Sequence, residues 1–187
     1  SPLLLLEFHG SKSSVEEQSE LFNEISKDFG GDNFEWSSSI EERNRLWKAR
    51  HDVYYAVKAS RPKAEYIATD VCVPISRLSE CIMETIEDME THKLYGPIVG
   101  HVGDGNFHVQ LMVDPKIKEE VDTANAFLER LAHRAINMDG TCTGEHGVGQ
   151  GKKQYLIDEL GPAVDFMKLI KQEIDPKGIM NPGKILQ

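Results

Sequence analysis

The sequence is poor in cysteine, in positive charge and in long apolar runs. Its 187 residues include three cysteines without regular spacing, which argues against a disulfide framework and fits a reducing compartment. The net charge of −10 makes a nucleic-acid or anionic-membrane surface an unfavourable interpretation. No apolar run is long enough to span a membrane, so a transmembrane protein is not expected.

Several sequence signatures are also missing. There is no Rossmann fingerprint, no P-loop and no His-Glu-x-x-His pattern of a zinc hydrolase. The short apolar run at residues 3–6 has no basic segment before it, so we interpret it as a buried strand and not as a signal peptide. A chain that begins inside a predicted strand is expected to be a piece of a longer protein. Any targeting segment would then lie outside it.

The composition is that of a globular domain with a sizeable core, at 40% hydrophobic and 28% charged residues. Helix caps, breakers and periodicity predict strands and helices in mixed order. The predicted strands are residues 3–8, 33–37, 66–73 and a hairpin at 97–113, and the predicted helices are residues 13–27, 39–60, 76–92, 114–138, 152–159 and 162–174. This order predicts an α+β fold, an antiparallel or mixed sheet with helices packed on one face, plus C-terminal helices.

The hairpin predicted at residues 97–113 organises the chemistry of the chain. Its two arms are apolar and β-branched, and residues 103–106, Gly-Asp-Gly-Asn, are typical of a tight turn. Pairing across a four-residue loop would set Val102 opposite Phe107. Side chains alternate along a strand, so one apolar face is predicted, made of Val102, Phe107, Gly100, Val109, Ile98 and Leu111.

Two histidines of the hairpin fall on its other face. The same pairing sets His101 opposite His108, with Cβ atoms about 5 Å apart, close enough for both imidazoles to bind one metal ion. The alternative is two polar residues on a solvated sheet face. A matched pair beside a glycine-rich turn favours the metal.

A second motif lies at residues 141–151, where four glycines in eleven residues indicate a close backbone approach or a strained turn. Within it, Glu145 precedes His146. Two histidines and one carboxylate form an open ligand set, so His101, His108 and Glu145 are the predicted metal ligands, and His146 is left free as an acid or base. The alternative is a flexible linker whose Glu and His are solvated.

Both motifs, together with the segment Met-Asn-Pro-Gly-Lys at residues 180–184, resemble the C-terminal domain of FAD-linked oxidases. The branch most similar is that of the mitochondrial D-lactate dehydrogenases (cytochrome), with glycolate oxidase and D-2-hydroxyglutarate dehydrogenase as relatives. The resemblance covers residues 3–186. It implies a ferredoxin-like α+β domain over residues 1–187 that binds substrate and metal, with FAD bound mainly by an N-terminal domain that this chain lacks.

The resemblance also implies roles for individual residues. Arg50 matches the arginine that presents its guanidinium to the substrate carboxylate, a suitable geometry for a planar fork, although a surface or helix-pairing arginine is equally compatible. Asn181 lies in the segment that approaches the flavin in relatives, although a simple terminal turn explains it equally well. His101, His108 and Glu145 would hold Zn or Mn, and His146 would bind the substrate and take its hydroxyl proton.

The expected reaction is oxidation of a D-2-hydroxy acid to the 2-oxo acid, with the hydride passing to FAD and the electrons to an acceptor such as cytochrome c. Mitochondrial localisation follows from the resemblance alone. The 2-hydroxyglutarate branch carries Tyr-Lys-Tyr-Asp where this chain has Ile67, Ala68, Thr69 and Asp70, so a second substrate carboxylate would lack its lysine. A monocarboxylate such as D-lactate is therefore favoured.

Two other function classes remain open at the level of sequence. A zinc metallohydrolase also uses two histidines and a glutamate, although it usually carries them on a His-Glu-x-x-His helix. A non-catalytic α+β metal-binding or assembly module would use the glycine-rich loops only to shape a surface. Hydrolysis without added flavin would favour the hydrolase, and absence of bound metal would favour the assembly module.

Overall fold

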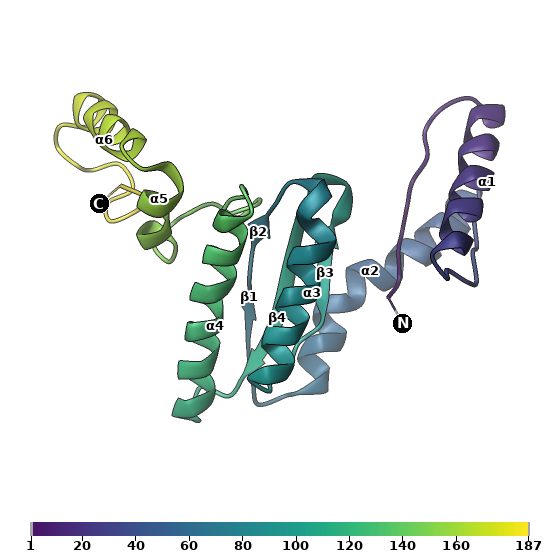
Figure 1. Cartoon of the computed structure of the whole chain (residues 1–187), viewed down its shortest axis with the longest axis horizontal. Coiled ribbons are helices and arrows are strands. Elements are labelled where there is room, and N and C mark those ends of the chain that lie inside the picture. Colours follow the sequence, from purple (N-terminus) through teal and green to yellow (C-terminus); the bar gives the residue numbers. More distant parts are fainter. Residues whose placement is uncertain (1, 187) are drawn as a thin grey trace. The chain divides into compact units, whose positions relative to one another are not determined.

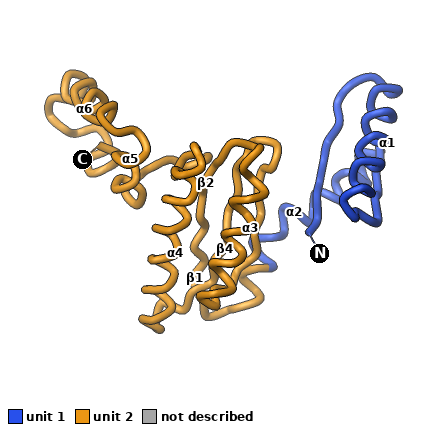
Figure 2. The backbone as a smooth tube through the Cα atoms, in the orientation of Figure 1, with its two compact units in different colours: residues 1–56 blue, residues 57–187 orange. Residues whose placement is uncertain are grey.

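A computed structural model describes residues 2–186 and divides into two compact units, residues 1–56 and residues 57–187 (Figure 2). Six α-helices and a small antiparallel sheet are found in the described chain, so the predicted α+β class is confirmed. None of the described helices is long and apolar enough to cross a membrane. All three cysteines are free thiols, as their irregular spacing predicts.

The first unit contains α1 (Lys12–Asp28) and most of α2 (Ile40–Ser60), which continues into the second unit. Serine caps begin both helices: the Ser11 side chain accepts the Ser14 N–H at 3.3 Å, and the Ser39 side chain accepts the Glu42 N–H at 3.4 Å. Such caps satisfy N–H groups that the first helical turn leaves without a partner.

The two strands predicted in the first unit, residues 3–8 and 33–37, are not formed. The two segments pack through side chains instead, because the Phe22 ring on α1 lies 6.2 Å from the Phe8 ring and 5.8 Å from the Phe34 ring, between centroids. An apolar stretch forms a strand only when another backbone edge is available to pair with it. Here one helix supplies an aromatic contact and no such edge.

The second unit holds the sheet, whose strands all pair with one long central strand, β4. Two short strands pair along one edge of β4 in a single register, and a third pairs along the other edge. The strands are β1 (Glu65–Ala68), β2 (Val71–Cys72), β3 (Ile98–His101) and β4 (Asn106–Val113). The predicted strand at residues 66–73 is therefore interrupted, and the interruption is Thr69 and Asp70.

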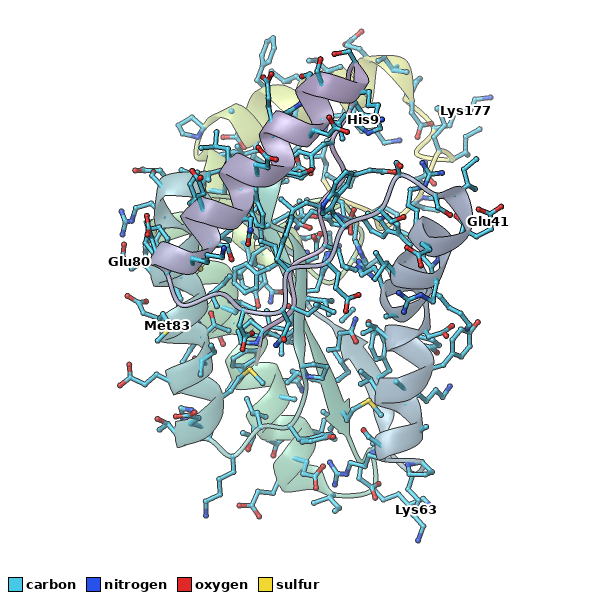
Figure 3. The ribbon with its side chains drawn as sticks, turned by 90° about the vertical axis from the view of Figure 1, so that its right-hand side faces the viewer. His9, Glu41, Lys63, Glu80, Met83 and Lys177 are labelled. Atoms are coloured by element: carbon cyan, nitrogen blue, oxygen red, sulfur yellow. The ribbon has the colours of Figure 1, made fainter. Side chains whose placement is uncertain are left out.

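The two faces of β4 differ in chemistry. Phe107, Val109, Leu111 and Val113 point into the main core, where residues of α3 (Ile75–Thr91) and α4 (Lys118–Asn137) pack on them (Figure 1). On α3, Glu80 and Met83 project away from the sheet (Figure 3). The predicted arrangement of helices on one face is thus observed. The other face of β4 carries the buried polar residues Asn106, His108 and Gln110.

The hairpin register differs from the prediction. His101 lies opposite Asn106, and His108 lies opposite Val99, so the two histidines are diagonal neighbours and not direct partners. The turn is a 3-10 helix, η1 (Val102–Asp104), closed by Gly105.

Gly105 explains the shift. It adopts a left-handed φ of 76° and donates its N–H to the Val102 carbonyl, so pairing starts at the next residue, one position earlier than predicted. A turn displaced by one residue shifts the register by two, which leaves each side chain on its predicted face. Val102 is the exception, because it has left the strand and is exposed.

The C-terminal part contains α5 (Lys153–Leu160) and α6 (Ala163–Ile174). The glycine-rich segment that precedes α5 is joined to the sheet by an antiparallel bridge between Thr141 and Cys72, with N–H to carbonyl distances of 2.8 Å and 3.2 Å. This bridge places residues 143–146 beside the interruption between β1 and β2.

Candidate functional site

The site is built around His108, near the start of the central strand. Its ring is buried, and its Nδ1 lies 2.8 Å from the Thr69 carbonyl oxygen. A carbonyl only accepts, so Nδ1 carries the ring proton and donates it. In the neutral ring, Nε2 then presents a lone pair. Partners of this kind set the tautomer of metal-binding histidines in proteins.

Glu145 and His101 meet His108 on the same side of the sheet. Glu145 Oε1 lies 2.9 Å from His108 Nε2 and 3.8 Å from His101 Nε2. The two imidazole rings lie 6.1 Å apart, between centroids. The diagonal placement of the histidines therefore still lets both rings reach one carboxylate oxygen.

His146 stands at the exposed side of this group. Its Nε2 lies 3.4 Å from Glu145 Oε1, and its ring centroid lies 5.2 Å from that of His108. The side chains of His101, Glu145 and His146 are each about half exposed, whereas that of His108 is buried. Solvent or a small molecule can thus reach three of the four groups.

The glycine-rich loop is held in place by Asp70, which is 2% exposed. Its carboxylate accepts the His146 N–H at 2.9 Å, the Glu145 N–H at 3.1 Å and the Thr143 hydroxyl at 3.0 Å. It also accepts the Asn106 amide at 3.0 Å and lies 3.2 Å from the Lys152 ammonium.

These contacts fix the charge of Asp70. Burial alone would raise the pKa of the Asp70 carboxyl. The His146 N–H, the Lys152 charge, the Glu145 N–H and the Asn106 amide outweigh burial and hold that pKa well below its usual range. The residue is therefore an anion at physiological pH.

Two overlapping sets of side chains could hold a metal ion, since the donor atoms within each set lie within 4.8 Å of one another. One is His101, His108 and Glu145, and the other is Asp70, His108 and His146. The oxygens of Asp70 already accept hydrogen bonds from four groups besides Lys152, so they have little capacity left for a metal. The geometry favours the first set, which is the one predicted from the sequence.

Cys142 belongs to neither of these two sets of donor side chains. Burial and the neighbouring Glu159 raise the pKa of its thiol to about 12.

The remaining predicted site residues belong to other elements of the chain. Arg50 is a half-buried residue of α2 in the first unit. Asn181 is exposed, with a left-handed φ of 49°, in a C-terminal tail that bonds to the glycine-rich segment. In that tail, the Ile185 N–H donates to the Gly149 carbonyl at 2.8 Å, and Lys153 donates to the Gly183 carbonyl at 3.1 Å.

Three residues of the site were missed at the level of sequence: Asp70, Asn106 and Lys152. A signal existed for Asp70, because a carboxylate in the middle of the apolar stretch 66–73 is costly unless it has partners. The signal does not say which partners these are. They come from β4 and from a segment more than seventy residues later in the chain, which only the fold brings together.

Comparison with known proteins identifies the family of this chain. The profile of the family described as FAD linked oxidases, C-terminal domain, matches residues 1–185. The chain belongs to this family.

Relatives from the FAD linked oxidases match over most or all of the chain. A probable mitochondrial D-lactate dehydrogenase of Danio rerio is 53% identical over 100% of the chain and 38% of its own length. The mitochondrial D-lactate dehydrogenase [cytochrome] of Arabidopsis thaliana is 41% identical over 100% of the chain and 33% of its own length. The glycolate oxidase subunit GlcD of Bacillus subtilis is 31% identical over 98% of the chain and 39% of its own length.

A solved structure shares the fold. The 4-ethylphenol oxidase of Gulosibacter chungangensis, in complex with isoeugenol, superposes with a TM-score of 0.63 at 16% identity, over 95% of this chain and 37% of that one. The sequence relatives and this solved structure are all much longer than the chain. The chain spans less than two-fifths of the length of each of these oxidases and dehydrogenases.

Proposed function

We propose that this chain is the substrate- and metal-binding part of a mitochondrial, flavin-dependent D-2-hydroxy acid dehydrogenase. Its substrate is D-lactate or a similar monocarboxylate, its product is the 2-oxo acid, and its electron acceptor is a protein such as cytochrome c. The names of the relatives from Danio rerio and Arabidopsis thaliana support the activity and the compartment. FAD is held mainly by a part of the polypeptide outside this chain.

One contact carries the metal proposal. His108 Nδ1 donates to Thr69, so Nε2 of the neutral ring presents a lone pair, and 2.9 Å away lies Glu145 Oε1, a second acceptor. Two lone pairs at this distance repel each other unless a proton or a cation lies between them. A divalent ion bound by both atoms removes the repulsion, and His101 is placed to bind it as well.

The spacing of the donor atoms fits such an ion. Ligand bonds of about 2.0–2.2 Å in a tetrahedral zinc site put two donor atoms about 3.3–3.6 Å apart. The distances from Glu145 Oε1 to His108 Nε2 and to His101 Nε2, 2.9 Å and 3.8 Å, lie on either side of that range. Two imidazoles and one carboxylate suit zinc or manganese and leave positions for substrate.

Each polar group then has a role in the oxidation. His101, His108 and Glu145 would hold a metal ion, which would supply Lewis-acid polarisation of the substrate hydroxyl and carboxylate. His146 lies next to this ligand set and is half exposed, so it is the base that takes the hydroxyl proton. Arg50 binds the substrate carboxylate through its guanidinium.

The flavin would supply the hydride acceptor, because amino-acid side chains do not accept a hydride. Asn181 is the residue of this chain proposed to approach the flavin. The attachment of its tail to the glycine-rich segment, through Ile185 and Gly149, is consistent with a place near the site.

A monocarboxylate substrate is supported by Ala68. This residue pairs with Gln110 across β1 and β4, so it lies on the same sheet face as His108. In the 2-hydroxyglutarate branch a lysine stands at the corresponding position. A methyl side chain on this face offers no charge to a second carboxylate.

The test is elemental analysis of the full-length polypeptide that contains this chain, with a His108→Ala variant. We expect about one Zn or Mn per chain in the wild type and none in the variant, since a ligand set of two groups binds weakly. The matched control is His133→Ala, which removes a histidine on α4 whose ring contacts Tyr155.

Metal that persists in His108→Ala, or a wild type that stays free of metal after loading, would reject the metal site. In that event the 2.9 Å contact would be a hydrogen bond between His108 and Glu145. Loss of metal in the control as well would show that the variants act through general misfolding.

A further inference from the structure

The Asp70 side chain makes hydrogen bonds that a residue between two short strands does not need. It lies at the interruption between β1 and β2, where a strand residue would pair with β4 and nothing more. Its side chain is instead buried under the glycine-rich loop and accepts the N–H groups of two successive residues, Glu145 and His146. The Asp70 carboxylate thus binds the backbone of both Glu145, a proposed metal ligand, and His146, the proposed base.

Glu145 depends on this anchor. Its side chain is 49% exposed, and the interactions found for it within the described residues are with His101, His108 and His146. A half-exposed glutamate keeps several accessible rotamers, so the reach of its carboxylate depends on where its backbone is held. Asp70 holds this backbone, because the Glu145 N–H donates to both Asp70 carboxylate oxygens, at 3.1 Å and 3.2 Å.

Asp70 also links the loop to the strand that carries the other ligand. The Asn106 amide donates to Asp70 and to the Val71 carbonyl, at 3.0 Å and 2.9 Å. Asn106 precedes His108 by two residues on β4, on the same face. The carboxylate is therefore the shared contact of the two segments whose ligands must meet.

Lys152 completes the arrangement from the other end of the loop. Its ammonium donates to the Asp70 backbone carbonyl at 2.7 Å and lies 3.2 Å from the carboxylate. It neutralises the buried charge and fixes the position at which the loop enters α5. Of the four residues from Thr143 to His146, three thus donate a side-chain or backbone hydrogen bond to Asp70.

We infer that Asp70 is the positioning residue of this site: it sets the Glu145 carboxylate against His101 and His108 and aims His146 at the same point. The inference rests on the proposed metal site and goes beyond it, because Asp70 binds neither metal nor substrate. It acts by fixing the two residues of the loop. Its expected signature is a loss of metal affinity in a protein that remains folded.

The test uses Asp70→Asn in the full-length polypeptide. Asparagine keeps the size of the side chain, but its amide meets N–H donors with a donor of its own and leaves Lys152 without its counter-charge. Titrate the apoprotein with Mn²⁺, followed by electron paramagnetic resonance, and with Zn²⁺ against a chelator. We expect affinity to fall about 10- to 100-fold, as for other residues that orient ligands.

The matched control is Asp88→Asn. Asp88 is a buried carboxylate that accepts from Arg130 and Arg134 between α3 and α4, on the opposite side of the sheet from the site. It should lose stability and keep its metal affinity. Thr143→Val is a milder second variant, because it removes a single hydrogen bond to Asp70, and it should weaken metal binding by a smaller factor.

The outcomes separate the two proposals. Wild-type protein without metal rejects the metal site and the inference together. Wild-type metal affinity in both Asp70→Asn and Thr143→Val rejects the inference alone, as does an equal loss of affinity in Asp88→Asn. Weakened metal binding in Asp70→Asn and Thr143→Val, with unchanged binding in Asp88→Asn, supports the inference. If Asp70→Asn folds too poorly to be titrated, weakened binding in Thr143→Val alone supports it.

Discussion

At the scale of single residues, the site depends on side chains that are small or absent as much as on the ligands. Gly144 lies between Thr143 and Glu145, where the loop approaches Asp70 and Asn106. A Cβ at this position would lie 1.9 Å from the Asn106 amide nitrogen and 2.8 Å from Asp70 Oδ1. Both atoms are engaged in the hydrogen bond from the Asn106 amide to Asp70, so neither can move aside without breaking it.

We therefore expect Gly144→Ala to lower the free energy of unfolding by about 1–3 kcal/mol, the usual cost of overpacking, and to weaken metal binding. Gly151→Ala is the matched control, because a Cβ at Gly151 meets nothing within 4 Å. Urea unfolding and metal titration of both variants make the comparison. Equal stability and equal metal affinity in the two variants would contradict the close approach.

At the scale of elements, α3 and α4 are joined by a buried charge as well as by the apolar core. Asp88 on α3 accepts from Arg130 at 2.6 Å and from Arg134 at 2.8 Å, both on α4. Burial alone would raise the pKa of Asp88, but these two arginines outweigh it and hold the pKa below its usual value. The helix pair is therefore stabilised by Asp88 only while Asp88 is ionised.

Asp88→Asn should lower the free energy of unfolding at neutral pH by about 2–3 kcal/mol. This is less than the roughly 3–5 kcal/mol for breaking a fully buried pair, because asparagine keeps one acceptor oxygen and Arg130 is partly solvated. Urea unfolding of the two proteins at neutral pH, followed by circular dichroism, measures the difference.

The same variant has a predicted pH dependence. A carboxyl whose pKa is lowered by folding stabilises the protein above its unfolded pKa of about 3.9, and the contribution is lost as the pH falls through the folded pKa. The difference in stability between wild type and Asp88→Asn should therefore be constant near neutral pH and shrink below about pH 4. A difference that persists unchanged in acid would mean that the arginines are not responsible.

At the scale of the whole molecule, the proposed function assigns one half of a reaction to this chain. The chain brings together a candidate ligand set and the loop that carries Glu145 and His146, whereas the relatives of which it spans 33–39% are named as dehydrogenases and oxidases. Metal and base can prepare a hydroxyl group for oxidation, but oxidation needs an acceptor for the hydride.

The isolated chain is therefore expected to bind metal and to show no D-lactate-dependent reduction of a dye, whereas the full-length flavoprotein reduces it. Circular dichroism of the isolated chain serves as the control for folding. Robust D-lactate-dependent dye reduction by the isolated chain, in fractions where no contaminating dehydrogenase is detected, would contradict the proposal that the flavin is bound outside this chain.

The sequence by itself determined which residues share a face and which residue types make up the candidate ligand set. Alternation along β4 places His101 and His108 on the face away from the core, and this holds although the register was predicted wrongly, because a shift of two residues preserves the alternation. The helices of the second unit were predicted nearly throughout, since their apolar periodicity and breakers are local signals.

Only the tertiary structure decided how those residues meet. The register depends on the left-handed conformation of Gly105, and more than one residue of a Gly-Asp-Gly-Asn turn could have adopted that conformation. The strands expected at residues 3–8 and 33–37 needed a pairing edge that no local pattern reveals. The proposed role of Asp70 depends on a loop more than seventy residues later in the chain. The charge of a buried carboxylate depends on the groups that the fold places beside it.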